Sequence, residues 1–314
     1  MNTSVPPGSS IGRFDAHVVR FAPAATSTRL SDYWALTKPE INFLIVITTF
    51  AGFYLGWAGA WNRSAFLLAT HAVLGTLLVA SGTGALNQYM ERDFDAQMRR
   101  TARRPLAAGR LKPSSALWFG ITLSVLGSFY LAVIVNWLSS LLAVGTLLCY
   151  LFVYTPLKRK TPLCTLVGAF PGGLPPLIGW AAATGRLTRA AWLPYTVLFL
   201  WQFPHFMAIA WMYREDYARA GYQVLPVGWR AKINLMNRQT LLPLLALLIV
   251  SLVPALAGGA GSSYGIGACV LGAGFLYCGA QFVLQRSSAA ARRLLGASIF
   301  YLPLLFMLMM LAKG

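Results

Sequence analysis

Apolar runs of about twenty residues recur along almost the whole chain, and they restrict it to one class of fold. A run of this length forms a helix that can cross a hydrocarbon core of about 30 Å, and the chain is 57% hydrophobic with only 11% charged residues. Inside lipid the backbone must satisfy its own hydrogen bonds, and the runs lack the alternation of barrel strands. The sequence therefore predicts an all-α, polytopic membrane bundle. We expect about nine transmembrane helices, at residues 41–60, 65–88, 115–135, 137–155, 163–183, 190–212, 239–257, 264–284 and 294–312.

The charged residues predict how these spans are oriented. The formal net charge is +18, but the 26 lysines and arginines sit in short connections rather than in a soluble domain, which argues against nucleic acid as a partner. With a cytoplasmic N-terminus, the positive-inside rule is obeyed, and all eight acidic residues fall on the same side. The basic residues on the other side are Arg63, Arg186, Arg189 and Lys313.

The N-terminal segment differs in composition from the rest of the chain. Residues 1–30 are rich in Ser, Pro and Ala and contain no apolar core, so they do not form a secretory signal. We expect a flexible cytoplasmic tail followed by a single transmembrane domain at residues 31–314. A short mitochondrial presequence is the alternative, and Asp15 argues against it.

The stretch NQYMERDFDAQMRRTARRPL, residues 87–106, places acidic and basic side chains directly after an apolar run. On a helix that continues past this run, every fourth side chain lies on one face. The residues of that face are Asn87, Glu91, Asp95, Arg99 and Arg103. Hard oxygen donors at this spacing suit Mg²⁺, and the arginines would bind phosphate oxygens. Asp93 points elsewhere and is expected to pair with Arg92 or Arg100. The alternative interpretation is a solvated loop of mixed charge at the membrane surface.

A second acidic pair favours a binding site over a solvated loop. Glu215 and Asp216 follow the sixth apolar run, within FLWQFPHFMAIAWMYREDYARAGYQVLP at residues 199–226, again on the predicted cytoplasmic side. Two acidic clusters at equivalent ends of two four-helix halves indicate a parallel internal repeat that faces one cavity.

These motifs resemble the UbiA superfamily of intramembrane prenyltransferases, whose first motif is N-x-x-x-D-x-x-x-D. Asn87, Glu91 and Asp95 match it here. Three stretches are similar to the branch of this family that farnesylates haem, over about residues 30–312. They are NQYMERDFDAQMRRTARRPLAAGRL, YTPLKRKTPLCTLVGAFPGGLPPLIGWAAATG (154–185) and WQFPHFMAIAWMYREDYARAGYQVLPV.

The resemblance implies a fold, a reaction and a location. A UbiA-type bundle in the bacterial inner membrane, or alternatively the mitochondrial inner membrane, would transfer farnesyl from farnesyl diphosphate to the 2-vinyl group of haem B. Water is added, diphosphate is released and haem O is formed, with Mg²⁺ as cofactor. Besides these substrates, membrane lipid is an expected partner, as is a haem A synthase or an oxidase-assembly protein.

The resemblance also assigns roles to individual residues. Asn87, Glu91, Asp95 and Asp216 are the expected metal ligands and catalytic residues. Diphosphate would be bound by Arg99, Arg103, Lys158, Arg159 and Arg214. The last three could instead bind a haem propionate or anchor a helix end among lipid headgroups.

The sequence departs from the superfamily pattern at both acidic motifs. Glu91 stands where the first aspartate is expected, and Ala220 stands where a second D-x-x-x-D motif would end. Asp216 would therefore act alone, through water, or beside Glu215.

His205 is the intramembrane histidine with a functional interpretation. It precedes Asp216 by eleven residues, which on one helix places both on the same face about 16 Å apart. The resemblance suggests that it ligates haem iron or orients the porphyrin, and the alternative is a packing histidine beside Pro204.

The sequence also allows functions of other classes. A transporter would place its charges near the midplane within inverted repeats, and a haem-binding assembly protein would not need the Asn87, Glu91 and Asp95 face. Within the enzyme class, the alternative is prenylation of an aromatic quinone precursor. Span five is interrupted by Pro171, Gly172, Gly173, Pro175 and Pro176, either beside a cavity or for close packing.

Overall fold

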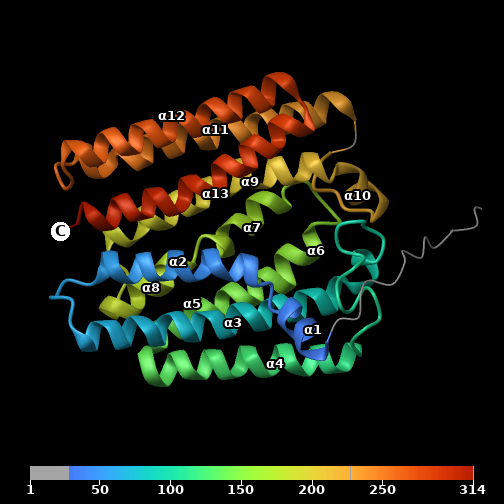
Figure 1. The fold of residues 1–314 in the computed structure, drawn as a ribbon, viewed down its shortest axis with the longest axis horizontal. Coiled ribbons are helices and arrows are strands. Elements are labelled where there is room, and N and C mark those ends of the chain that lie inside the picture. The colour runs from blue at the N-terminus through green and yellow to red at the C-terminus, as the bar shows by residue number, and fades with distance from the viewer. Residues whose placement is uncertain (1–27, 227, 314) are drawn as a thin grey trace, which may run out of the picture.

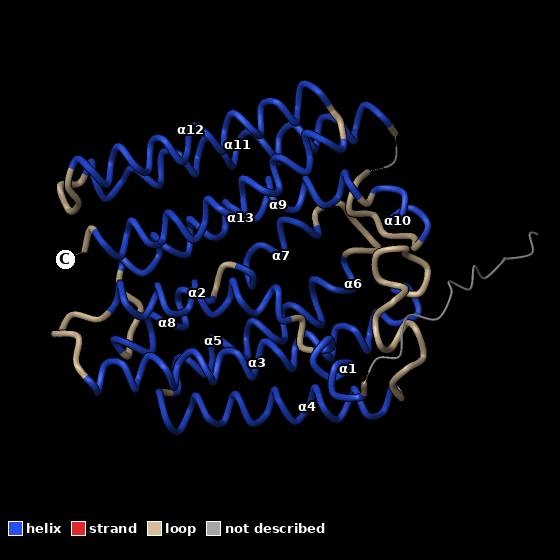
Figure 2. The backbone as a smooth tube through the Cα atoms, in the orientation of Figure 1, coloured by secondary structure: helices blue, strands red, loops and turns tan. Residues whose placement is uncertain are grey.

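The computed structural model describes residues 28–226 and 228–313, and this part of the chain is helical with no strand (Figures 1 and 2). The helices in chain order are α1 (Arg29–Leu36), α2 (Pro39–Gly56), α3 (Arg63–Asp95), α4 (Pro113–Tyr130), the π-helical segment η1 (Leu131–Val135), α5 (Trp137–Leu148), the π-helical segment η2 (Cys149–Tyr154), α6 (Thr155–Leu157), α7 (Cys164–Gly172), α8 (Pro175–Thr184), the short 3₁₀ helix η3 (Arg189–Ala191), α9 (Trp192–Met212), α10 (Arg214–Arg219), α11 (Trp229–Leu256), α12 (Ser262–Gln285) and α13 (Ser288–Leu311). Residues 1–27 of the predicted tail lie outside the described residues, and α1 already begins at Arg29.

Eight helical stretches of the described part are long and apolar enough to cross a membrane, judged by length and composition. They are Pro39–Gly56, Arg63–Asp95, Pro113–Val135, Trp137–Leu157, Cys164–Thr184, Trp229–Leu256, Ser262–Gln285 and Ser288–Leu311. The sixth predicted span is helix α9, which has 21 residues but does not belong to this set. Polar residues such as Gln202 and His205 lower the mean hydropathy of this helix. Helix α9 packs against α11 and α13, so protein covers much of its surface.

Side-chain burial agrees with a bundle in lipid. Large apolar side chains such as Trp118, Phe129, Ile249, Val270 and Phe300 are exposed on the outer helices, where a soluble protein would carry polar residues. The largest buried apolar cluster joins α9, α11, α12 and α13. The bundle has two sides, because α11 and α12 lie on one side of α9 and α13. The helices on the other side are α2, α3, α4, α5 and α8 (Figure 1).

The predicted interruption of span five is present, and the helix that follows it packs closely on α2. The helix stops at Gly172 and resumes at Pro175. A Cβ atom on Gly179 would lie 1.9 Å from the carbonyl oxygen of Thr49, so the backbones of α2 and α8 touch. The side-chain amide of Gln202 donates to the carbonyl of Ala169 at 3.1 Å, and the same carbonyl accepts the backbone N–H of Gly173 at 3.0 Å, so this polar side chain is bonded beside the break.

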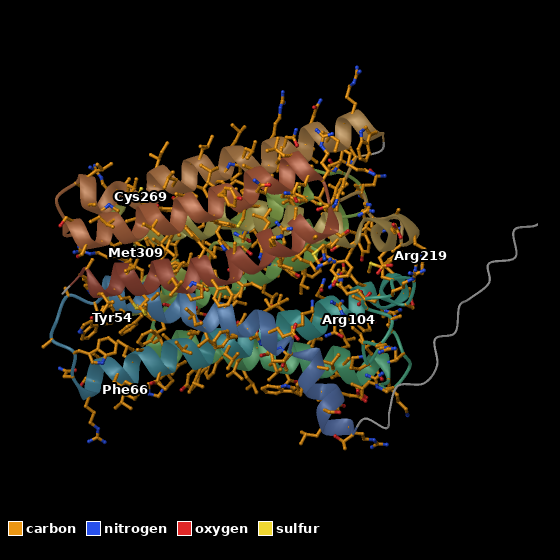
Figure 3. All side chains as sticks on the ribbon, turned by 45° about the horizontal axis from the view of Figure 1, so that its top comes forward. Tyr54, Phe66, Arg104, Arg219, Cys269 and Met309 are labelled. Atoms are coloured by element: carbon orange, nitrogen blue, oxygen red, sulfur yellow. The ribbon has the colours of Figure 1, made fainter. Side chains whose placement is uncertain are left out.

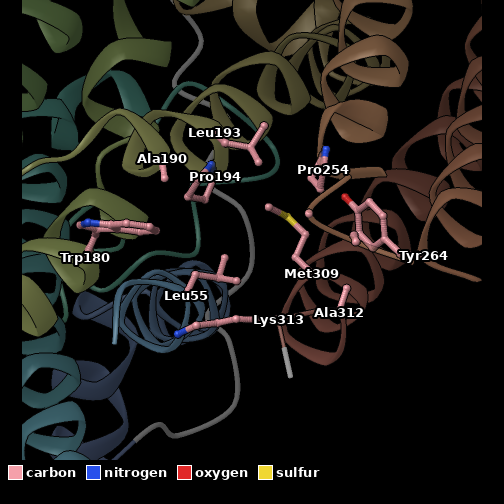
Figure 4. A pocket seen from close by; sticks show the side chains of 12 residues that line it. Leu55, Trp180, Ala190, Leu193, Pro194, Pro254, Tyr264, Met309, Ala312 and Lys313 are labelled. Carbon is pink, nitrogen blue, oxygen red and sulfur yellow. The ribbon is translucent and has the colours of Figure 1, made fainter. Parts of the chain in front are cut away.

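The two ends of the bundle differ in character. The segment 96–112, α6 and α10 lie together at the end where α1 also lies, and the C-terminus lies at the opposite end (Figure 1). This separation agrees with the odd number of crossings predicted from the sequence. At the C-terminal end, Lys313 donates to the carbonyl oxygens of Tyr54 and Trp57 beside a largely apolar hollow of about 190 Å³ (Figure 4). The acidic residues discussed below are at the other end.

Candidate active site

The acidic face of helix α3 is buried at the end of the bundle. Asn87, Glu91 and Asp95 follow one another at one-turn intervals, and all three are buried. Asp93 is 74% exposed and pairs with Arg92 at 3.7 Å, as the sequence predicted. The helix ends at Asp95, so the prediction that Arg99 and Arg103 continue the same helical face is wrong.

Asn87 joins three segments of the chain. Its amide nitrogen donates to the Thr155 hydroxyl at 3.2 Å, and its amide oxygen accepts a hydrogen bond from the Lys38 amine at 2.5 Å. Lys38 has a left-handed backbone, with φ of 54°, which costs free energy for a residue with a side chain. That conformation turns the chain from α1 into α2 and aims the amine at the acidic face. Burial, and after it the charge of Arg104, lowers the pKa of Lys38 to about 7.

Glu91 is held by a lysine and a tyrosine. The amine of Lys158 contacts both carboxylate oxygens, at 2.9 and 3.1 Å, and the hydroxyl of Tyr222 donates to one of them at 2.9 Å. The Lys158 amine also lies 4.7 Å from the centre of the Tyr154 ring. Burial opposes the charge of Lys158, but Glu91 outweighs it and raises the pKa of this lysine well above its usual value. Burial and Glu91 both raise the pKa of Tyr222.

Asp95 is bound by the segment that follows it. One guanidinium nitrogen of Arg104 donates to both carboxylate oxygens, at 2.9 and 2.7 Å. The hydroxyl of Thr101 donates to the backbone carbonyl of Asp95 at 2.9 Å, so the chain curls back over the helix end. Around this face, Lys158 and Arg104 supply two cations against two carboxylates. Lys38, with a pKa of about 7, is a third basic group, and an anionic ligand beside it would favour its protonated form.

The second acidic pair meets this segment directly. Asp216 is buried, accepts the backbone N–H of Arg100 at 3.2 Å and pairs with Arg219 at 3.2 Å. Glu215 is 77% exposed and pairs with Arg214 at 3.7 Å. The structure therefore distinguishes the two acids, and Asp216 is the inward one. Figure 3 shows Arg104 and Arg219 at the same end of the bundle.

An open hollow of about 360 Å³ lies beside the second acidic motif. It is lined by Arg99, Arg100, Met212, Tyr213, Glu215 and Asp216. Arg99 thus reaches the second acidic motif, although it is not on the helical face of the first. Tyr222, which follows the second motif, reaches Glu91 of the first, so both motifs lie at the same end of the bundle. The predicted internal repeat around one shared cavity stays a prediction.

The remaining predicted anion ligands lie at the rim of the site. Arg159 is exposed, and its guanidinium lies 4.1 Å from the centre of the Phe94 ring. Arg214 donates to the carbonyl of Trp211 at 3.0 Å and lies over the ring of that residue. Arg103 is exposed next to the inward Arg104. Arg103 and Arg159 are thus exposed at the bundle end, and Arg214 is partly exposed there.

His205 lies apart from the acidic groups. The helix breaks at Tyr213, where φ is −109° and ψ is 22°, and Asp216 belongs to the separate helix α10. The predicted common face of His205 and Asp216 on one helix is therefore wrong. Instead His205 contacts α13, where its Nδ1 lies 2.7 Å from the hydroxyl of Ser298. Its ring stacks on that of Trp201 with 4.5 Å between the centroids.

The donor set fits Mg²⁺ only if the existing ion pairs open. Carboxylate and amide oxygens are the ligands that this ion prefers, and it commonly completes its shell with substrate phosphate. In the described part of the chain, no three acidic, histidine or cysteine side chains are gathered as a ready-made metal cage. Each buried carboxylate is instead paired with a base, Glu91 with Lys158, Asp95 with Arg104 and Asp216 with Arg219.

Several residues of the site were missed by the sequence reasoning. They are Lys38, Arg104, Thr155 and Tyr222. Lys38 stands directly before Pro39 at the start of an apolar run, and Arg104 directly before Pro105, so a basic residue before proline was the available signal in both cases. Tyr222 follows a glycine with positive φ, Gly221, which marks a tight turn.

Comparisons with known proteins identify the family of this chain. Residues 45–308 match the UbiA prenyltransferase family. A protoheme IX farnesyltransferase of Solibacter usitatus is 49% identical over 290 residues, which is 90% of this chain and 99% of that protein. One of Koribacter versatilis is 41% identical over 291 residues, 90% of this chain and 94% of that protein.

Solved structures show the same fold at low sequence identity. A digeranylgeranylglyceryl phosphate synthase superposes with a TM-score of 0.72 at 16% identity, covering 90% of this chain and 98% of its own. A UbiA homolog from Archaeoglobus fulgidus, bound to GPP and Mg²⁺, has a TM-score of 0.60 at 14% identity, covering 86% and 99%. From its sequence match, its close relatives and its fold, the chain belongs to the UbiA prenyltransferase family.

Proposed function

We propose that this protein transfers the farnesyl group of farnesyl diphosphate to the 2-vinyl group of haem B, with addition of water, to give haem O. The observation that carries the proposal is the agreement among relatives that align along nearly the whole chain and share the name protoheme IX farnesyltransferase. In this reaction the bond between farnesyl C1 and the diphosphate oxygen breaks, and a vinyl carbon bonds to C1. Water adds its hydroxyl to the other vinyl carbon and releases a proton.

The leaving group is the chemical difficulty, and the acidic end of the bundle is suited to it. Diphosphate gains negative charge as it departs, and cationic groups fixed in a largely buried site stabilise that charge more than water does. Lys38, Lys158 and Arg104 are such groups, because each already lies against the face of α3. Arg99 and Arg100 line the neighbouring hollow and would bind the outer phosphate oxygens.

Mg²⁺ is the cofactor that we expect at this site. Asn87, Glu91, Asp95 and Asp216 would hold it, and it would neutralise diphosphate charge when bound. A homolog of the same fold binds Mg²⁺ together with GPP. For the carboxylates to act as ligands, their present partners must turn to the diphosphate. The basic residues that now neutralise the acids therefore become the anion-binding groups.

Haem would lie deeper in the bundle than the diphosphate. We expect His205 to ligate the iron and the rim arginines Arg159 and Arg214 to hold the propionates. The N-terminal side of the bundle, which carries the acidic site, would face the cytoplasm of a bacterial inner membrane. A haem A synthase or an oxidase-assembly protein would take up the product.

An acceptor assay tests the proposal. Purified protein is incubated with farnesyl diphosphate and either haem B or 4-hydroxybenzoate, and the product is identified by its mass. A farnesylated, hydrated haem supports the proposal, whereas prenylation of the aromatic acid alone would assign the protein to quinone synthesis. EDTA should abolish turnover and added Mg²⁺ should restore it.

A pair of neighbouring substitutions tests the metal assignment. Glu91→Gln removes a ligand with little change in volume and should lower kcat by on the order of 10²-fold or more. Asp93→Asn is the matched control, because Asp93 is exposed two residues away and pairs only with Arg92 among the ion pairs of the described residues. Equal activity of both variants across a Mg²⁺ titration would remove Glu91 from the site.

A further inference from the structure

Ser298 lies at the meeting point of helices α9 and α13 and contacts two side chains of α9. The indole N–H of Trp201 donates to the backbone carbonyl of Ser298 at 2.8 Å. The hydroxyl of Ser298 lies 2.7 Å from Nδ1 of His205 and 2.6 Å from the backbone carbonyl of Leu295. Trp201 also stacks on the His205 ring, so the ring plane is fixed from two directions.

The hydrogen bonds of Ser298 determine which nitrogen of His205 carries the proton. A carbonyl oxygen has no proton to donate, so the 2.6 Å contact with Leu295 requires the hydroxyl proton of Ser298. A hydroxyl has only one proton, so its oxygen must accept in the contact with His205. Nδ1 of His205 is therefore the protonated nitrogen, and in the neutral ring Nε2 keeps its lone pair.

Nε2 of His205 is available to a ligand. Within residues 28–226 and 228–313, Nδ1 is the ring nitrogen that makes a hydrogen bond, and Nε2 is not among the buried polar atoms without a partner. Half-buried His205 thus presents a bare, accessible nitrogen inside an apolar helix bundle. Histidines that bind metals commonly donate their other N–H to a neighbouring acceptor, which fixes the tautomer and the ring orientation.

We propose that Ser298 is a positioning residue that holds His205 with Nδ1 protonated, so that Nε2 coordinates the iron of the haem acceptor. The inference rests on the proposed function in one respect, namely that haem is the acceptor. Ser298 itself touches neither substrate. It acts by fixing the tautomer and by keeping the imidazole plane against Trp201.

The tautomer is measured first, in the protein without haem. The chain contains three histidines, so ¹⁵N labelling of histidine gives few ring resonances, and His205→Gln assigns those of His205. We expect His205 of the parent protein to show a protonated Nδ1 and a bare Nε2. In Ser298→Ala the acceptor is lost, and the population should shift toward the form with Nε2 protonated.

A conservative variant controls for packing. Ser298 is fully buried, and Ser298→Thr keeps the hydroxyl at the cost of one methyl group. It should retain the parent tautomer if its melting temperature shows that it folds. If Ser298→Thr does not fold, the tautomer of His205 in the parent protein is still decisive, because a protonated Nε2 in the parent would overturn the proposal.

Haem binding is measured second, by titrating ferric haem B into the purified protein and following the Soret band. Loss of the group that hydrogen-bonds a metal-ligating side chain commonly weakens metal binding by about 10- to 100-fold, so Ser298→Ala should raise the Kd for haem by that factor. The KM for farnesyl diphosphate should stay unchanged. His205→Ala should abolish the ligand-specific spectrum altogether.

The outcomes separate this inference from the proposed function. If His205→Ala changes the spectrum but Ser298→Ala leaves both the tautomer and haem affinity as in the parent, the role of Ser298 is wrong and farnesylation of haem stands. If neither variant alters haem binding while the parent still forms haem O, the roles of Ser298 and His205 in haem binding are both wrong and farnesylation of haem again stands. If the parent forms no farnesylated haem, the proposed function is wrong, and so is the proposal that Nε2 coordinates haem iron.

Discussion

Replacing Arg104 by glutamine should strengthen the binding of Mg²⁺ and weaken the binding of diphosphate. Arg104 contacts both carboxylate oxygens of Asp95, whose side chain is only 2% exposed, while the arginine is 24% exposed. Mg²⁺ alone must displace this cation before Asp95 becomes a ligand. In Arg104→Gln the displacement is unnecessary.

The magnitudes follow from the burial of the pair. Removing one partner of a buried ion pair costs about 3–5 kcal/mol, so the variant without ligand should melt several degrees below the parent. Binding of Mg²⁺ to the freed Asp95 should recover part of this lost stability. A recovery of about 1.4 kcal/mol corresponds to a tenfold higher affinity of the variant for Mg²⁺. A hydrogen bond to a charged group contributes about 1.5–3 kcal/mol. The affinity for inorganic diphosphate in the presence of Mg²⁺ should accordingly fall by about tenfold or more.

The assay is a pair of titrations in detergent solution. Calorimetry or a thermal shift gives the affinity for Mg²⁺ alone, and then for diphosphate at saturating Mg²⁺. Arg103→Gln is the matched control, because Arg103 is the adjacent residue and is exposed. A lower or unchanged Mg²⁺ affinity in Arg104→Gln, or identical behaviour of the two variants, would refute the idea that Asp95 exchanges Arg104 for Mg²⁺ while Arg104 turns to the diphosphate.

Other predictions concern helix packing, the hydrogen bond from Tyr222 to Glu91, and orientation in the membrane. Gly179→Ala should lower the melting temperature strongly, since its Cβ would lie 1.9 Å from a carbonyl oxygen of α2, whereas Gly145→Ala, with nothing within 4 Å, should not. Tyr222→Phe should lower kcat/KM by about tenfold through the lost hydrogen bond to a carboxylate, with a normal melting temperature as the check on folding. Cysteine labelling of intact cells should modify a cysteine placed near Arg186 from outside and leave one near Arg100 protected, and the reverse pattern would invert the topology.

The sequence predicted the acidic face of α3 because that prediction used only helical periodicity. Asn87, Glu91 and Asp95 lie within one helix, so a four-residue spacing was sufficient. The extension to Arg99 and Arg103 failed because residues 96–104, AQMRRTARR, contain good helix formers and no breaker before Pro105. Tertiary contacts end the helix there instead.

The same limit explains the error at the second motif. Nothing in WMYREDY marks the break at Tyr213, since neither glycine nor proline is present, and a continuous helix was the natural prediction. The break turns α10 so that Asp216 meets the N–H of Arg100, more than a hundred residues earlier in the chain. Contacts of this range do not leave a periodic pattern, and the partner of His205 on α13 was hidden for the same reason.

The two acidic residues at the end of α3 receive their neutralising base from other segments of the chain. Arg104, the partner of Asp95, comes from the segment after α3, and Lys158, the partner of Glu91, from the end of α6, whereas Asp216 pairs with Arg219 within α10. Removal of an isolated buried charge from water is costly, so in the absence of ligand these pairs hold the segments together. A ligand that brings both Mg²⁺ and diphosphate supplies new partners to the acids and to the bases at once. We therefore expect the two to bind cooperatively, because either one alone must break ion pairs that it cannot fully replace.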